Sequence, residues 1–188
     1  NAQTIQIIAD YLEAEEVENL LEGMVKNLNT NADLDTFYYK NIGVDAFRKT
    51  PLILNSAFTS QDFTSAAGDK TLLKIGELIG PQVEMYQQGE RQFDVDTDYN
   101  HLYYRELKVD IPEGYSFKNL DKLNMDFHDK EKTMRFVSKY ELNKNSLTVR
   151  VSEFYSKIHY PKSMFETFRS VINAAADFNK ITIVIEPN

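Results

Sequence analysis

The segment of residues 132–155 constrains the fold most, because it reads as two alternating strands joined by a short Asn-rich link. Alternate apolar residues mark one face of each half: Met134, Phe136, Tyr140 and Leu142 in the first, and Leu147, Val149, Val151 and Tyr155 in the second. Period-two alternation is typical of a strand with one buried face. Asn tolerates the left-handed backbone of tight turns, so the link at residues 143–145 predicts a long β-hairpin.

Further strands are expected on both sides of this hairpin, wherever short runs alternate or are continuously apolar. We predict them at residues 4–9, 34–39, 51–57, 71–75, 103–111 and 181–185. Residues 76–86 predict an irregular connection or bulged strand, and residues 119–129 predict a polar connection. The run at 181–185 is almost wholly apolar, which favours a position inside a sheet.

Two helices are indicated by apolar residues at a spacing of three and four. They are predicted at residues 13–28 and 164–178, and Ser163 with Glu166 matches a capping box before the second helix. The expected fold class is therefore α+β, mainly β: an antiparallel β-sandwich-like domain with two packed amphipathic helices.

One domain is expected over residues 1–188, since this length supports one sizeable core and no repeat or flexible linker interrupts it. The alternative is a subdivision into residues 1–48, a strand-helix-strand lead-in from an upstream core, and a β-rich C-terminal domain at residues 49–188. The chain begins with Asn and leads at once into an alternating run, so we expect it to be a piece of a longer protein.

The amino-acid composition excludes several classes of binding partner and of catalytic or metal site. The net charge of −8 disfavours nucleic acid and anionic membrane surfaces as partners. The absence of Cys excludes a disulfide framework, a thiolate zinc site and a cysteine nucleophile within the chain. No apolar run approaches the roughly 20 residues of a membrane span.

The acidic residues Asp94, Asp96 and Asp98 alternate along one predicted strand. Counted from Asp94, the sixth and twelfth positions of an EF-hand loop are Tyr99 and Arg105 instead of Gly and Glu. The row is more typical of the solvent face of a strand. Calcium binding remains the alternative, but we predict that the chain needs no metal and no cofactor.

Catalytic motifs are lacking in the sequence. The three histidines form no i, i+4 pair, and no Gly-x-Ser-x-Gly elbow is present. A pair of carboxylates that meet in space remains open as a glycosidase site, without support from spacing. The residues therefore indicate a non-catalytic domain, in which exposed aromatic residues at Tyr99, Tyr103 and Tyr104 are the candidate contacts for a glycan or peptide ligand.

Several runs of the chain resemble the C-terminal domain of bacterial transglutaminase-like proteins. They are PLIL at 51–54, GELIGPQVEMY at 76–86, ER at 90–91, IPEGY at 111–115 and NL at 119–120, with a similar closing helix and strand after Tyr160 and Pro161.

In such proteins, which resemble cysteine peptidases, this domain follows a core that carries a Cys-His-Asp triad. The resemblance implies a secreted protein of the periplasm or cell surface, and a C-terminal domain that is itself of unknown function. It implies no catalytic residue in this chain. We therefore expect an accessory, structural domain whose partner is the upstream transglutaminase-like core of the same polypeptide, against which it packs or whose cleft it gates.

Overall fold

The computed structural model describes residues 2–28, 33–86 and 89–188. The chain separates into two compact units, Asn1–Asp62 and Phe63–Asn188, which we call unit 1 and unit 2. The sequence places the alternative boundary earlier, at residues 48 and 49. Within the described residues, no helix combines the length and apolarity needed to cross a membrane.

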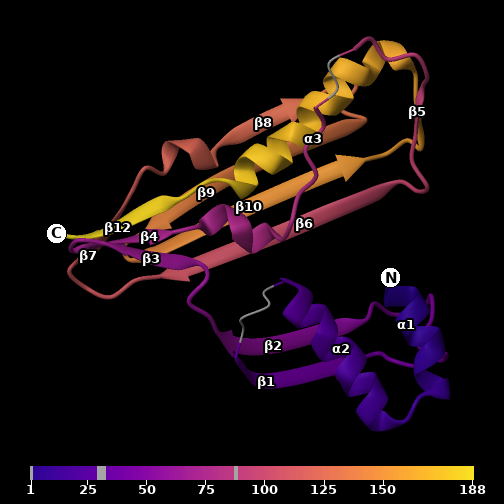
Figure 1. Cartoon of the computed structure of the whole chain (residues 1–188), viewed down its shortest axis with the longest axis horizontal. Coiled ribbons are helices and arrows are strands. Elements are labelled where there is room, and N and C mark those ends of the chain that lie inside the picture. Colours follow the sequence, from indigo (N-terminus) through magenta and orange to yellow (C-terminus); the bar gives the residue numbers. More distant parts are fainter. Residues whose placement is uncertain (1, 29–32, 87–88) are drawn as a thin grey trace. The chain divides into compact units, whose positions relative to one another are not determined.

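Unit 1 is a short hairpin accompanied by helices (Figure 1). Its elements are helix α1 (Ala2–Ile8), the 3₁₀ helix η1 (Ala9–Tyr11), helix α2 (Ala14–Leu28) and strands β1 (Asp33–Lys40) and β2 (Ile53–Thr59). The strands pair antiparallel, and their partly buried side chains pack on a small core with α1 and α2. The helix predicted at residues 13–28 and the strands predicted at 34–39 and 51–57 are thereby confirmed.

The strand predicted at residues 4–9 is wrong, because this segment forms α1 and the start of η1. Ile5 and Ala9 stand four residues apart and are both buried, which is a helical spacing. Gln6 is also buried, and its side-chain amide donates to the carbonyl oxygens of Asn41 at 2.7 Å and Thr50 at 3.0 Å. These distant acceptors fix the helix, and a local pattern does not reveal them.

Unit 2 contains the remaining strands and the C-terminal helix of the chain. The strands are β3 (Thr64–Ala67), β4 (Lys70–Leu73), β5 (Val95–Asp96), β6 (His101–Asp110), β7 (Tyr115–Lys118), β8 (Met125–His128), β9 (Met134–Asn143), β10 (Ser146–Tyr155), β11 (His159–Tyr160) and β12 (Ile183–Pro187). The helical elements are η2 (Ile75–Ile79), η3 (Asp121–Leu123), η4 (Lys162–Met164) and α3 (Phe165–Asn179). Two sheets of four strands have the orders β6-β10-β9-β8 and β3-β4-β12-β7, and β5 pairs with β11.

The predicted hairpin is confirmed as β9 and β10, which pair antiparallel over their full lengths. Lys144 in the turn has a φ of 51°, the left-handed conformation that the link was expected to supply. On β10 every second side chain from Leu147 to Tyr155 is buried. The polar connection predicted at 119–129 is wrong in part, because it contains β8, in which Met125 is half-buried and Phe127 is 40% exposed. A strand of four residues offers too few positions for an alternating pattern to be recognised.

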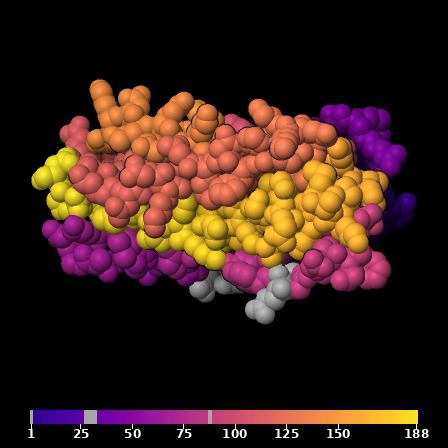
Figure 2. Space-filling view, turned by 90° about the horizontal axis from the view of Figure 1, so that it is seen from above, coloured from indigo at the N-terminus to yellow at the C-terminus, as the bar shows by residue number. Residues whose placement is uncertain are grey.

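Helix α3 lies along the sheet of β6, β10, β9 and β8, and Figure 2 shows its surface directly beside residues of β8 and β9. Its buried side chains join a core that includes residues from both four-stranded sheets. Strand β12 lies between β4 and β7, which confirms that it is internal to a sheet. The mainly β fold with two amphipathic helices is confirmed, with 39% of the described residues in strands; its antiparallel sheets are not closed.

The predicted capping box is wrong. Ser163 lies in η4, two residues before α3 begins at Phe165, and Glu166 pairs with Arg169 on the helix surface. The backbone N–H of Lys162 donates instead to the Asp94 carboxylate at 2.7 Å. The carboxylate of Asp94, the residue just before β5, therefore supplies the acceptor near the start of this helical segment, although it lies 68 residues earlier in the chain.

The irregular conformation of residues 76–86 results from a close backbone contact between this segment and the end of α3. Gly76 lies in η2, and its N–H donates to the carbonyl oxygen of Ile181 at 3.0 Å. The side-chain amide of Asn179 donates to the carbonyl oxygens of Gly76 at 3.1 Å and Gly80 at 2.9 Å. Gly80 has a φ of 84°, which glycine adopts without steric cost. These bonds attach η2 to the end of α3.

Candidate functional site

A hollow of about 270 Å³ lies between the face of β6 and β10 and one side of α3. The residues that line it include His101, Tyr103 and Arg105 of β6, Glu153 and Tyr155 of β10, and Phe168 of α3. Alternation places the three β6 residues on one face, and the register sets His101 opposite Tyr155 and Tyr103 opposite Glu153. We call this hollow the aromatic groove.

The rings of the aromatic groove form a continuous row centred on His101. Its ring centroid is 5.5 Å from that of Tyr99, 5.1 Å from that of Tyr103 and 4.8 Å from that of Tyr155. Tyr155 continues the row to Phe168 at 5.7 Å. Tilted and edge-to-face pairs at these separations are favourable beyond the area that they bury. The row presents flat apolar surface together with polar ring atoms.

A partly buried ion pair lies beside these rings. Arg105 Nη1 is 3.4 Å from Glu153 Oε2, and Glu153 is only 8% exposed. The Tyr155 hydroxyl donates to the other Glu153 oxygen at 3.2 Å, and the Arg105 guanidinium lies over the Tyr103 ring at 4.9 Å. A buried carboxylate costs free energy unless it is paired in this way. The groove therefore offers fixed charge and hydrogen-bonding groups next to its aromatic wall.

The two tyrosine hydroxyls of the groove remain protonated at neutral pH. Burial raises the pKa of Tyr155, and the neighbouring Glu153 carboxylate raises it further. Burial also raises the pKa of Tyr103, with an added contribution from Tyr99. Phenols in this state act as hydrogen-bond donors rather than as bases. This arrangement is suited to binding.

The three tyrosines that the sequence indicates as ligand contacts lie on opposite faces of the sheet. Tyr99 and Tyr103 meet through His101 and are 59% and 42% exposed. Tyr104 is also exposed but lies on the opposite face, in a separate hollow beside Val137. A single site can therefore contain Tyr99 and Tyr103, whereas Tyr104 belongs to another surface.

Sequence reasoning did not single out His101 or Glu153 for this site. Glu153 continues the odd-numbered positions of β10, which are otherwise apolar and buried. A charged residue at a core position of an alternating strand was the signal that pointed to a buried polar contact. His101 similarly occupies the β6 face that includes Tyr103.

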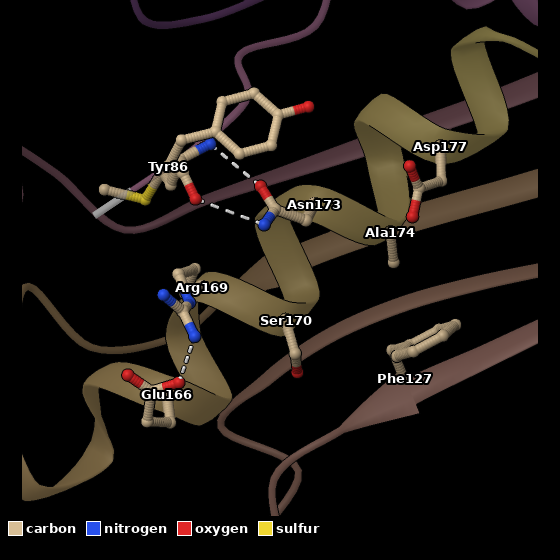
Figure 3. Close-up of a pocket in the computed structure, with 9 residues that line it drawn as sticks. Tyr86, Phe127, Glu166, Arg169, Ser170, Asn173, Ala174 and Asp177 are labelled. Carbon is tan, nitrogen blue, oxygen red and sulfur yellow. Dashed lines mark hydrogen bonds and ion pairs between the residues drawn. The ribbon is translucent and has the colours of Figure 1, made fainter. Parts of the chain in front are cut away.

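A second hollow, of about 510 Å³, runs along the outer side of α3 (Figure 3). Asn173 binds the backbone of Met85 twice, by accepting from its N–H at 2.8 Å and donating to its carbonyl oxygen at 3.2 Å. Figure 3 draws both bonds as dashed lines at Asn173. Glu166 and Arg169 pair with each other at the other end. The bonds of Asn173 connect α3 to the segment that contains Met85, so we assign this hollow a structural role.

Two of the three alternating acidic residues, Asp94 and Asp96, lie next to His159. His159 Nδ1 lies 2.7 Å from Asp96 Oδ1, and its Nε2 lies 3.4 Å from Asp94 Oδ2. The register of β5 and β11 sets His159 directly opposite Asp96. Within the described ranges, no group of three or more His, Asp and Glu side chains is placed to hold a metal ion. The geometry that we observe is that of a histidine held by two carboxylates.

We expect His159 to titrate above its ordinary value. The hydrogen bond with Asp96 raises the pKa of His159 most, burial opposes this rise, and the charges of Asp96 and Asp94 add to it. The stability contributed by the charged imidazole is therefore fully present below the ordinary pKa of about 6.5 and is lost as pH rises through the higher, folded value. Asp96→Asn should lower the pKa of His159 in an NMR titration of the imidazole protons. An unchanged midpoint in this variant would contradict the assignment.

Comparisons with known proteins give one family match. The model of a family described as Domain of Unknown Function with solved-structure structure (DUF3858) matches residues 78–185, which lie within unit 2. No curated protein and no solved structure matched the chain.

Proposed function

Because the chain belongs to the DUF3858 family, whose function is unknown, we propose from its geometry that it is a non-catalytic accessory domain that binds another polypeptide segment through the aromatic groove. The observation that supports this most is the exposed ring of Tyr103 next to the partly buried pair of Arg105 and Glu153. Aromatic and arginine side chains are the residues that most often anchor protein interfaces.

The chemistry of the groove favours recognition over reaction. Its phenols are neutral donors, and Glu153 is occupied by Arg105 and Tyr155. The chain contains no Cys that could act as a nucleophile. A peptide side chain with an apolar plane and a polar end matches such a surface.

The partner that we propose is a transglutaminase-like core in the same polypeptide. This rests on the resemblance of residues 51–54, 76–86 and 111–115 to the C-terminal domain of such proteins. The domain would then pack against or gate the core, and would act in the periplasm or at the cell surface. Within this proposal the two four-stranded sheets pack in a sandwich-like manner.

The test compares the parent protein with and without these 188 residues. We expect deletion to lower the melting temperature of the core or to change its peptidase rate, and the separately produced chain to restore it in trans. Tyr103→Ala should weaken this binding at least about tenfold, since loss of an aromatic anchor costs about 2 kcal/mol. Tyr104→Ala is the matched control, because Tyr104 lies on the opposite face.

Two results would refute the proposal. One is a truncated parent with unchanged melting temperature and unchanged peptidase rate. The other is an equal loss of binding in the Tyr103→Ala and Tyr104→Ala variants, which would place the partner away from the groove.

Glycan binding is the second candidate. It is favoured by the exposed rings of Tyr99 and Tyr103, which lie on either side of His101 beside the charged pair. Binding of the chain on a glycan array that is lost in Tyr103→Ala would support this candidate over a polypeptide partner.

A further inference from the structure

Strand β6 forms an edge of its four-stranded sheet (Figure 1). Its neighbour β10 pairs with it along the whole strand, and the N–H of Ile111 donates to the carbonyl oxygen of Asn145 at 2.9 Å. Because backbone groups in an antiparallel pair alternate in direction, the odd-numbered residues of β6 bond to β10. The N–H and C=O groups of the even-numbered residues therefore point away from the sheet.

These outward residues are Leu102, Tyr104, Glu106, Lys108 and Asp110. Within the described ranges no strand pairs with this side of β6. A ten-residue edge with free backbone groups is a template for pairing with a further strand. Charged side chains on such an edge normally oppose non-specific pairing, so the order of the charges decides what the edge accepts.

The charges of β6 are complementary to those of a second, antiparallel copy of β6. With Leu107 opposite Leu107, Glu106 of each copy faces Lys108 of the other, and this occurs twice by symmetry. Tyr104 then lies opposite Asp110, to which its hydroxyl can donate. All the backbone pairs made by Tyr104, Glu106, Lys108 and Asp110 are of the hydrogen-bonded kind, because these residues point outward.

Neighbouring registers are opposed by like charges. A shift that keeps each side chain on its face places Glu106 against Glu106 in one direction and Lys108 against Lys108 in the other. A further shift places Arg105 against Arg105. Registers centred on Tyr103, Tyr104 or Val109 overlap fewer residues of β6, so they make fewer hydrogen bonds, and none contains a Glu–Lys pair.

We propose that a second copy of this chain binds along the free edge of β6, so that two four-stranded sheets join into one continuous antiparallel sheet in a two-fold dimer centred on Leu107. This inference rests on the edge of β6 and not on the aromatic groove. A contact of this length is at the small end of stable interfaces, so we expect a weak, reversible dimer.

A single cysteine tests the register, since the chain has no other thiol. Leu107→Cys places two sulfur-bearing residues in a non-hydrogen-bonded pair with Cα atoms about 4.5 Å apart, which suits a disulfide. Val109→Cys is the matched control, because it lies opposite Arg105 and about 13 Å from its own copy along the strand. In a glutathione buffer we expect a covalent dimer of Leu107→Cys only. Equal cross-linking of both variants, or of neither, would overturn the register.

Exchanging the charges of Glu106 and Lys108 tests whether these residues specify the dimer. The measurement is sedimentation equilibrium of the full chain. The unmodified chain should dimerise, and Glu106→Lys or Lys108→Glu alone should weaken the dimer by several-fold to about tenfold, because each creates two like-charged pairs. Lys108→Glu is the cleaner of the two, since Glu106 also pairs with Arg150 of its own chain at 2.7 Å. The double exchange E106K/K108E should recover most of the affinity. A monomer at all concentrations, or a double variant no better than the single ones, would refute the dimer. Tyr103→Ala should leave dimerisation unchanged, which separates this result from that of the groove.

Discussion

Replacing Gly76 by Ala should destabilise unit 2 by more than about 3 kcal/mol, or prevent it from folding. A Cβ atom at this position would lie 2.1 Å from the carbonyl oxygen of Phe178 and 2.6 Å from that of Asn179. Both are backbone atoms at the end of α3, so no change of rotamer relieves the overlap. Moving them apart would also break the hydrogen bond between Gly76 and Ile181.

The measurement is guanidinium unfolding followed by circular dichroism. Gly89→Ala is the matched control in unit 2, because among the described residues, its chain neighbours aside, no atom lies within 4 Å of the site of its Cβ. We expect this exposed substitution to change the free energy of unfolding by no more than about 0.5 kcal/mol. If Gly76→Ala unfolds like the control, η2 does not approach α3 as closely as described.

Phe168→Ala should cost about 3–5 kcal/mol of the free energy of unfolding, as large-to-small changes in a core do. Phe168 is 4% exposed, and its ring centroid lies 5.7 Å from that of Tyr155 and 5.3 Å from that of Tyr160. Removing the ring opens a cavity between α3 and these two aromatic neighbours. It also removes one wall of the aromatic groove.

Phe93→Ala provides the comparison, since Phe93 is 79% exposed and its loss creates no cavity. It should stay within about 0.5 kcal/mol of the unmodified chain in the same thermal and denaturant melts. A Phe168→Ala variant as stable as Phe93→Ala would mean that α3 does not pack on the sheet.

Elements with long, regular patterns were predictable from the sequence. The hairpin of β9 and β10 and the helices α2 and α3 repeat their apolar spacing over ten residues or more, so local errors average out. Segment α1 was not predictable in this way. Its Ile5 and Ile7 alternate like a strand, whereas the contacts of Gln6 with Asn41 and Thr50 that accompany the helix come from far along the chain.

The candidate site shows the same division. The exposed Tyr99 and Tyr103 follow from composition and alternation, but their meeting through His101 depends on the register of β6 on β10. The pair of Arg105 and Glu153 likewise joins positions that are 48 residues apart. The order of charged residues along β6, in contrast, can be read directly from the sequence. Once the pairing of β6 with β10 is known, that order shows which charges the free edge presents.

The position of β12 has a consequence for biosynthesis. β12 is the strand between β4 and β7, yet it follows both in the chain, and the ion pair of Lys70 with Glu186 spans 116 residues. While the polypeptide is being translated, β4 and β7 leave the ribosome before the strand that joins them exists. Their apolar faces are then exposed in the nascent chain until the last of these strands emerges. Because the sheet is completed only when β12 pairs with strands far earlier in the chain, its folding is slow. A chaperone, or premature association with another chain, has the most effect before β12 has emerged.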